Sequence, residues 1–529
     1  MKFAQLHYQV GRHMRKTLLP MVSLCALSAC MVGPKYHAPK PWSPSHYDTH
    51  ARENGKTSPQ SVVTELPFDD EWWKSFKDPE LASLEERIAT QNLDLQLATA
   101  NLAQSRAEMM IAGAERFPML SAQGTYARAQ NSSRQLRRII RRISKKTGGM
   151  AEVPRDATIP LLNQWDYSID ATYEVDLWGR VARQYQASKA LMEMTEEERR
   201  SVLIAQQADM ARDYLQLRGD QKRMRVLTAS HKTLSDLLDL TQNRYKSGLV
   251  TELDVDSVQS RLHQVDAQMA QLSQSVAQEK NAIAYLLGAP PKSLEQELEK
   301  GQDIPVVPPF VPAGLPSELA HRRPDVREAE ARLRETVAEV GEATADFYPK
   351  VTINADFGFQ TLSFKDLGFW GSRAWNVGPS VSLPIFQGGR LTGQLKLKKA
   401  AQKAAAISYR QTVLKSWHEV DNVLQNYHDE QNRRQGLYQS VHDSQRSFDL
   451  ALNQYRSGLS TYLDVLNAQI QVQQGQMDLA SSDAKVAVDL ARLYNALGGG
   501  WQEDLPDETQ SGQSPRQMLA EAVQTAPAH

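Results

Sequence analysis

The segment WDYSIDATYEVDL, residues 165–177, decides the fold of this chain of 529 residues. Each odd-numbered position from Trp165 to Leu177 carries an aromatic or aliphatic side chain, and each even-numbered position carries Asp, Ser, Thr or Glu. A period of two places alternate side chains on opposite faces of a β-strand. The sequence therefore predicts a strand with one apolar face and one acidic or polar face.

Three further segments alternate in the same way, and strands are predicted over 118–129, 350–361 and 375–386 as well as over 165–177. Each is long enough for the about 9–11 residues that a tilted strand needs to cross a bilayer. A half-buried sheet in a soluble domain would show the same alternation. In a membrane, four strands cannot close a barrel, because the smallest transmembrane barrels have about eight, and an open edge would leave backbone groups unpaired in lipid. A barrel wall therefore needs more than one chain.

Long helices are predicted between the strands. Residues 181–288 and 391–498 contain no proline, and in the first stretch Leu and Met recur at intervals of seven, as in a coiled coil. A Ser-Gly-Leu tripeptide interrupts each stretch once, and its glycine suits the left-handed conformation that ends a helix. The predicted helices and the tip turns that join them are 181–246, 247–251 and 252–288, and then 391–456, 457–461 and 462–497.

Two pairs of matching segments indicate an internal repeat. RYKSGLVTELDVDSVQ, residues 244–259, recurs as QYRSGLSTYLDVLNAQ, residues 454–469, and the segment 92–120 matches the segment 323–351. Self-similarity of this kind is a guide to architecture. We predict an α+β fold with two copies of helix, strand, strand, long helix, turn and antiparallel helix. The predicted domains are a first repeat over 72–288, a linker over 289–320 and a second repeat over 321–501.

The N-terminus is typical of an export signal. Basic residues precede the apolar run TLLPMVSLCAL, and LSAC then ends at Cys30. LSAC resembles a lipobox, which predicts acylation of Cys30; an ordinary secretory signal with a chance cysteine is the alternative, and Met14 could replace Met1 as the start. Met31 is not the Asp that usually retains lipoproteins in the inner membrane, so we expect an outer-membrane lipid anchor. The flanking segments are predicted as a signal peptide over 1–29, a lipidated linker over 30–71 and a disordered tail over 502–529.

Composition and motifs exclude several classes of protein. The formal net charge is −1, so no nucleic-acid partner is implied. The two cysteines, Cys25 and Cys30, both lie near the N-terminus, which excludes a disulfide framework and a cysteine-based metal site. The twelve histidines show no metal-site spacing and no HExxH motif. We find no catalytic constellation and expect neither an enzyme nor a cofactor.

Five strings make the sequence resemble the TolC-like outer-membrane efflux proteins, specifically the lipoprotein branch that works with resistance-nodulation-division pumps. The resemblance extends from about Cys30 to Trp501, nearly the whole of the expected mature chain. The strings are LSACMVGPKYHAP, WWKSFKDPELASL from Trp72, LPSELAHRRPDVREAEARL from Leu315, PIFQGGR from Pro384 and ALGGGW from Ala496.

The resemblance implies a fold and a function. Three identical chains with four strands each would form a twelve-stranded β-barrel in the outer membrane, on an α-helical barrel that crosses the periplasm. This trimer would be a passive exit duct for drugs or other toxic small molecules. An inner-membrane pump would supply the energy through a periplasmic adaptor, a membrane fusion protein. A general outer-membrane porin is the alternative, although porins lack so long a helical column, and a periplasmic adaptor would lack the four alternating strands.

The resemblance also assigns roles to the two tip turns, which in the family converge at the periplasmic mouth and receive the adaptor. The residues implied in adaptor docking are Ser247, Gly248, Leu249, Thr251, Ser457, Gly458, Leu459 and Thr461. The residues implied in the periplasmic gate are Tyr245, Asp254, Tyr455, Asp464 and Asn467.

The two aspartates have an alternative role as helix caps. Asp254 and Asp464 each follow a threonine by three residues, near the N-terminus of a predicted helix. A ring of such carboxylates at a closed mouth would attract cations and repel anions. Family members can carry a basic residue at the position of Ser460 and an acid at that of Asn467, so we do not expect salt bridges to lock this gate.

Overall fold

The computed structural model describes residues 31–40, 42–44, 46–47, 61–64, 71–129, 138 and 161–501. The chain divides into two compact units, each made from three pieces of the sequence. Unit 1 contains the described residues within 1–37, 107–190 and 334–404, and unit 2 contains those within 38–106, 191–333 and 405–529. The predicted signal peptide, Cys30 and the predicted tail lie outside the described residues.

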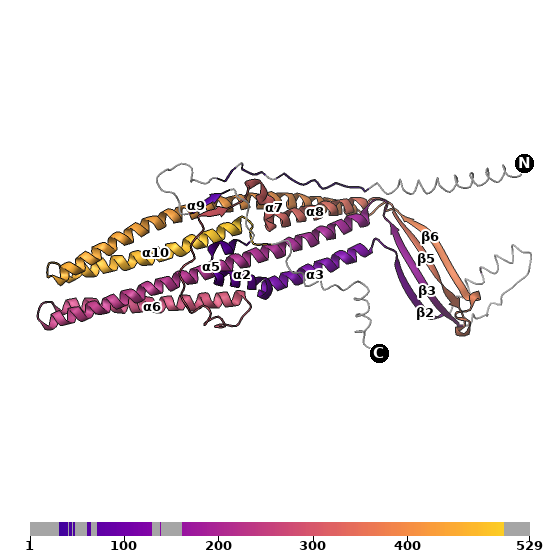
Figure 1. The fold of residues 1–529 in the computed structure, drawn as a ribbon. Helices are drawn as coiled ribbons and strands as arrows, with labels where there is room; N and C mark the ends of the chain where they lie inside the picture. Colours follow the sequence, from indigo (N-terminus) through magenta and orange to yellow (C-terminus); the bar gives the residue numbers. More distant parts are fainter. Residues whose placement is uncertain are drawn as a thin grey trace, which may run out of the picture. The chain divides into compact units, whose positions relative to one another are not determined.

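Unit 1 contains a four-stranded antiparallel sheet (Figure 1). Its strands are β2 (Met119–Ala129), β3 (Leu162–Val175), β5 (Lys350–Thr361) and β6 (Arg373–Ser382), hydrogen-bonded in the order β2-β3-β5-β6. Within the described part of the chain, β2 and β6 each pair along one edge only. Both outer edges of the sheet are therefore open in the single chain.

In the middle of the sheet the register aligns apolar residues with apolar residues and polar with polar, whereas at its ends Met119 pairs with Thr172 and Phe359 with Arg373. One apolar row consists of Ala122, Ile169, Phe357 and Trp375. The adjacent row on the other face consists of Ser121, Asp170, Asp356 and Asn376. All of β2 is exposed on both faces. The period of two read from the sequence thus produces one apolar and one polar face that extend across all four strands.

The strand predicted over 165–177 is shifted toward the N-terminus. It begins at Leu162, because the pairing with β2 continues as far as Ala129. It ends at Val175, because the Leu177 N–H donates to the Val175 carbonyl at 2.8 Å and the chain turns away from the ladder. Asp176 and Leu177 therefore belong to the junction with the following helix, and the predicted boundary was wrong there.

Proline explains two other boundaries. The strand predicted over 375–386 spans Arg373–Ser382 and stops before Pro384, which has no N–H to donate to a ladder. The strand predicted over 118–129 begins at Met119, directly after a proline, for the same reason. These prolines mark the points at which the sheet ends and the connections to helices begin.

The six long helices occur in pairs of equal length. They are α3 (Leu93–Ala114) and α8 (Pro324–Ala345) with 22 residues each, α5 (Arg180–Lys246) and α9 (Arg390–Arg456) with 67 each, and α6 (Glu252–Leu286) and α10 (Tyr462–Ala496) with 35 each. The helix predicted over 252–288 ends two residues early and that over 462–497 one residue early. Gly288 at φ +62° and Gly498 at φ +76° end these helices in the left-handed conformation. No helix among the described residues is both long and apolar enough to cross a membrane.

Several short elements were not predicted. Helix α2 (Pro79–Gln91) is capped by Asp78, whose Oδ1 accepts from two backbone N–H groups at 2.9 and 3.1 Å. Strand β1 (Val62–Thr64) pairs in parallel with β4 (Phe310–Pro312), so each predicted linker contributes a strand. The other short helices are η3 (Trp72–Phe76), η4 (Pro316–Glu318), α7 (Leu319–Arg322), η5 (Phe364–Asp366) and η6 (Trp370–Ser372).

Unit 2 has a large aromatic core and a smaller cluster in the halves of the helices that lead to the tips. In the large core Trp72 stacks on Tyr494 at 5.2 Å, and the Tyr214 hydroxyl donates to the Asp78 carboxylate at 2.8 Å. We call the smaller cluster the tip core. It consists of Leu227, Leu234, Leu237, Val258, Val265, Leu272, Phe448, Tyr455, Tyr462, Val465, Leu466 and Val472, from α5, α6, α9 and α10.

Candidate gate and docking surface

The two tip turns of unit 2 have the same backbone hydrogen bonds. In the first turn the Leu249 N–H donates to the Arg244 carbonyl at 3.0 Å, and the Gly248 N–H donates to the Tyr245 carbonyl at 2.9 Å. This pair of bonds is a Schellman motif, which satisfies the last carbonyls of a helix. Gly248 has φ +70°, and in the second turn Gly458 has φ +76° with the same two bonds at 2.9 and 3.0 Å. Glycine adopts this conformation without the strain of a Cβ atom.

Each tip aspartate closes a capping box. The Thr251 N–H and hydroxyl both donate to Asp254 Oδ2, at 2.9 and 2.8 Å. Thr461 donates to Asp464 Oδ2 in the same way, at 3.0 and 2.7 Å, and the Ser460 hydroxyl adds a third bond at 2.9 Å. The bonds from Thr461 and Ser460 lower the pKa of Asp464 below its ordinary value. Both aspartates therefore have the geometry of helix caps, the alternative role that the sequence offered for them.

The residues assigned to docking lie at the surface. Ser247, Gly248, Leu249, Thr251, Ser457, Gly458, Leu459 and Thr461 are all exposed. Leu249 and Leu459 are 73% and 81% exposed, so each tip leaves a large apolar side chain uncovered in the single chain. A groove of about 650 Å³ lies beside the second tip. Its lining residues are Ser447, Leu450, Ala451, Gln454, Gly458, Leu459, Ser460, Thr461 and Asp464.

The residues assigned to the gate do not share one environment. Tyr455 belongs to the tip core and is 2% exposed, and its ring meets Tyr462 edge-on at 6.2 Å. Tyr245, its counterpart in the first tip, is 44% exposed. Asp464 and Asn467, three residues apart on α10, are both exposed. Tyr455 therefore braces the tip from inside, whereas Tyr245 does not.

Arg244 joins the first tip to the second, a contact that sequence reasoning missed. Its guanidinium lies 4.1 Å from the centre of the Tyr455 ring, within the range of a cation–π interaction. Its Nη2 also donates to the carbonyls of Tyr455 and Arg456, at 3.0 and 3.4 Å, at the C-terminal end of α9. A cation is favourable there because the last carbonyls of a helix carry partial negative charge.

A buried polar layer joins three helices behind the tips. The Ser230 hydroxyl on α5 donates to Gln473 Oε1 on α10 at 3.1 Å, and Arg261 on α6 donates to the same oxygen at 3.0 Å. The amide of Gln473 donates in turn to Gln268 at 3.0 Å. Ser230 and Gln473 are 5% and 3% exposed. Polar residues at such positions fix the register of packed helices.

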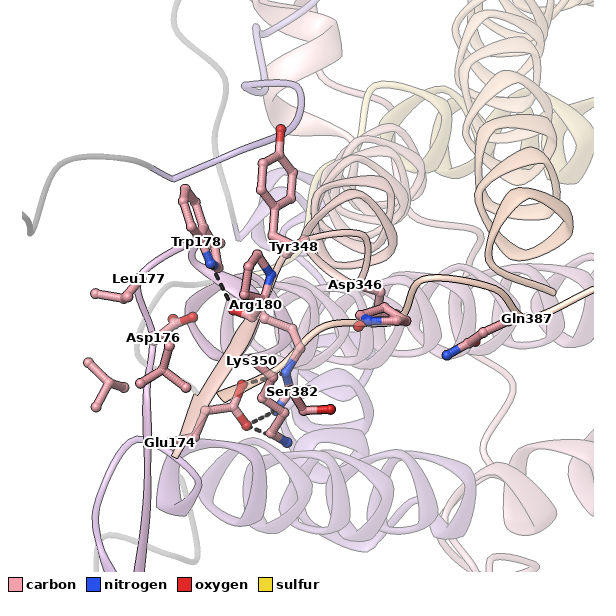
Figure 2. Close-up of a pocket in the computed structure, with 15 residues that line it drawn as sticks. Glu174, Asp176, Leu177, Trp178, Arg180, Asp346, Tyr348, Lys350, Ser382 and Gln387 are labelled. Carbon is pink, nitrogen blue, oxygen red and sulfur yellow. Dashed lines mark hydrogen bonds and ion pairs between the residues drawn. The ribbon is translucent and has the colours of Figure 1, made fainter. Parts of the chain in front are cut away.

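In unit 1 an ion-pair network joins the ends of β3 and β5 (Figure 2). Arg180 binds Glu174 with two hydrogen bonds of 2.8 Å, and the Lys350 ammonium lies 2.7 Å from the same carboxylate. Beside it the rings of Trp178 and Tyr348 stack at 4.8 Å. These residues line a cavity of about 190 Å³. The charges of the cavity largely satisfy one another, which favours a structural junction over a ligand site.

The fold and the two tips agree with a known family. The family model described as outer membrane efflux protein matches residues 84–289 and 315–499. These two segments make up most of the chain and contain all four strands of the sheet and both tip turns. The chain belongs to the outer membrane efflux protein family.

Relatives of the family are similar over nearly their whole length. The solvent efflux pump outer membrane protein SrpC of Pseudomonas putida is 30% identical over 488 residues, which cover 91% of this chain and 98% of SrpC. The pyoverdine export outer membrane protein OpmQ of Pseudomonas aeruginosa is 31% identical over 440 residues, which cover 82% of this chain and 88% of OpmQ.

Solved channels of the family share the fold. The outer-membrane channel OprN superposes with a TM-score of 0.80 at 30% identity, covering 89% of this chain and 100% of OprN. The outer membrane protein VceC from Vibrio cholerae superposes with a TM-score of 0.73 at 26% identity, covering 82% of this chain and 100% of VceC.

The comparisons confirm the resemblance to TolC-like outer-membrane efflux proteins. The efflux role and the outer-membrane location follow at the level of the family. Family members are transport ducts, so the expectation that the chain is not an enzyme is also confirmed. Among the residues that the structure describes, no group of His, Cys, Asp and Glu is arranged to hold a metal ion.

Proposed function

We propose that three copies of this chain form the exit duct of a tripartite efflux pump, through which drugs or other toxic small molecules cross the periplasm and the outer membrane. The duct is passive, and an inner-membrane pump supplies the energy. The names of relatives that export solvents, antibiotics and pyoverdine support the efflux of small molecules.

One observation carries the trimeric barrel: the sheet of unit 1 has a continuous apolar face and two open edges. In lipid, open edges are costly because each unpaired backbone group lacks a partner. Pairing β2 of one chain with β6 of the next removes every edge. Three chains of four strands then close a twelve-stranded barrel with apolar residues toward lipid and polar residues toward the lumen.

The equal lengths of the paired helices support the internal duplication. Each half supplies two strands and one hairpin, α5 with α6 or α9 with α10. In the trimer these antiparallel helices form an α-helical barrel on the β-barrel. We infer that the domains are the two repeats over 72–288 and 321–501, with acylation of Cys30 anchoring the N-terminal linker in the outer membrane.

The tips form the periplasmic gate and the adaptor docking surface. The exposed leucines and the groove beside the second tip offer an apolar, notched surface to the helical hairpin of a periplasmic adaptor. Asp464 and Asn467 lie exposed on one face of α10, where three copies would place a ring of polar groups at the mouth. Adaptor binding opens this gate.

The test is the mass of the detergent-extracted protein by light scattering corrected for bound detergent, followed by conductance in a planar bilayer. We expect three chains per particle and a pore that stays mostly closed without the adaptor. A monomer in detergent contradicts the shared barrel. A trimer that conducts freely without any partner favours the alternative, a general porin.

A further inference from the structure

The first described residues of the chain, 31–34, belong to unit 1 and lie against its other two pieces. The Val32 N–H donates to the Trp178 carbonyl at 3.1 Å. Arg183 Nη2 donates to the Pro34 carbonyl at 2.9 Å. Backbone groups on both sides of Gly33 are therefore hydrogen-bonded to the first turn of α5 and to Trp178, two residues before that helix begins.

Three glycines, one in the segment and two in the surface that it contacts, leave no room for a side chain at this site. A Cβ on Gly33 would lie 2.6 Å from the Cα of Gly341 in α8, and a Cβ on Gly179 would lie 2.4 Å from Cγ of Met31. A Cβ on Gly341 would lie 2.7 Å from Nε of Arg183. Real Cβ atoms essentially never approach other atoms this closely, so a side chain at any of the three positions would force the segment 31–34 or its neighbours to shift.

The segment also supplies a hydrogen-bond acceptor to Arg183, a polar residue of the slot, the surface around Gly179 and Gly341 that the segment contacts. Arg183 is 5% exposed, and burial lowers its pKa. One end of its guanidinium donates to Gln186 at 3.1 Å and the other to Pro34. Without the segment, a buried cation would lose a hydrogen-bond acceptor, which is unfavourable. The segment is thus an integral part of unit 1.

We propose that this slot is a rigid mount for the N-terminal acyl anchor, where the sequence alone would allow a flexible tether. The proposal rests on the proposed acylation of Cys30. Cys30 directly precedes Met31 in the sequence. Met31 contacts Gly179, four residues after β3 ends. The slot therefore fixes the origin of the acyl chains to the end of a strand, so that anchor and strands enter the membrane as one body.

The test compares Gly33→Ala with Gly368→Ala. Both glycines belong to unit 1 and have nearly the same left-handed φ, +90° and +88°. A Cβ on Gly368 meets nothing within 4 Å, so this control carries the backbone strain without the clash. The measurement is the rate at which trypsin cuts the intact detergent-extracted protein after Lys35, which separates residues 30–35 from the channel. Mass spectrometry quantifies the released peptide.

We expect Gly33→Ala to be cut about tenfold faster than wild type, because proteolysis follows the population of the released segment. Gly368→Ala should match wild type. Equal rates for all three proteins, or fast cutting of wild type, would overturn the mount. The mass of the released peptide tests the acylation separately. A peptide without acyl groups would refute the lipid anchor, and the mount with it, whereas an acylated peptide cut at equal rates would refute the mount alone.

Discussion

The two tips of the hairpins have the same backbone and different surroundings. Gly248 and Gly458 make the same turns, and both turns are followed by capping boxes. The tyrosine before each turn is half-exposed in the first tip, Tyr245, and fully buried in the second, Tyr455. The repeated sequence therefore forms the same local turn twice. Packing between the helices, however, buries the tyrosine of the second tip and leaves the tyrosine of the first tip at the surface.

The largest difference is expected when each tyrosine is replaced by alanine. Tyr455→Ala should lower the free energy of unfolding by about 3–5 kcal/mol, the usual loss for a buried aromatic side chain. Tyr245→Ala should change it by no more than about 0.5 kcal/mol, as for most surface positions. Denaturant unfolding of the detergent-solubilised proteins, followed by circular dichroism, measures both. Equal losses would mean that the proposed trimer buries the first tip as well.

Arg244 offers the next largest contrast, because Gln454 occupies its position in the second tip. Arg244→Ala should destabilise by about 1–2 kcal/mol, since it removes a cation–π contact and a cation at the end of α9. Arg244→Lys should recover part of this loss, because lysine keeps the charge but not the planar fork. Gln454→Ala, on an exposed face, should have little effect.

The same variants also test the proposed gate. If Arg244 holds the two tips together, Arg244→Ala should raise the conductance of the channel in a bilayer without the adaptor, and Gln454→Ala should not. A loss of stability without any change in conductance would make Arg244 a purely structural contact.

Sequence reasoning was most successful where the structure is local. The alternation around Ile169 and the glycines of the tips determine strands and turns through backbone geometry alone, and the strand and helix bounds differ from prediction by a few residues. The three-residue strands β1 and β4 were missed because a pairing so short and so distant in sequence leaves no period to detect.

The candidate site was predicted less completely, because it depends on contacts between distant segments. Arg244 and Tyr455 are 211 residues apart, and nothing in either copy of the repeat marks the arginine as a partner of that tyrosine. The network of Glu174 and Lys350 is hidden for the same reason. The signal that could have drawn attention to Arg244 is the mismatch itself, since it is a charged residue where the other repeat has glutamine.

Alanine substitutions of the two tip glycines should lower the stability equally, and they therefore serve as the control for the comparison of the two tips. A Cβ on Gly248 or on Gly458 meets nothing within 4 Å, so only backbone strain opposes alanine at either position. We expect Gly248→Ala and Gly458→Ala to destabilise equally, by about 1 kcal/mol. The measurement is thermal unfolding at matched concentration. Unequal losses would show that the turns differ in the assembled protein although they match in the single chain.

The smallest expected difference between the two tips concerns the aspartates that cap α6 and α10. Hydrogen bonds from Thr461 and Ser460 lower the pKa of Asp464, whereas Val250 takes the place of Ser460 in the first tip and donates nothing to Asp254. A carboxyl group with a lowered pKa in the folded protein contributes stability above its ordinary pKa of about 3.9, and this contribution is lost as the pH falls through the lowered value.

Asp464→Asn should therefore weaken the pH dependence of unfolding below about pH 4 and leave it unchanged near neutrality. Ser460→Ala should produce part of the same change, because it removes one donor and keeps the carboxylate. Unfolding midpoints measured from pH 6 to pH 3 test this order. If Ser460→Ala left the pH dependence unchanged, the extra hydroxyl at the second tip would not contribute to the lowered pKa of Asp464, and the hydrogen bonds from Thr461 would account for it.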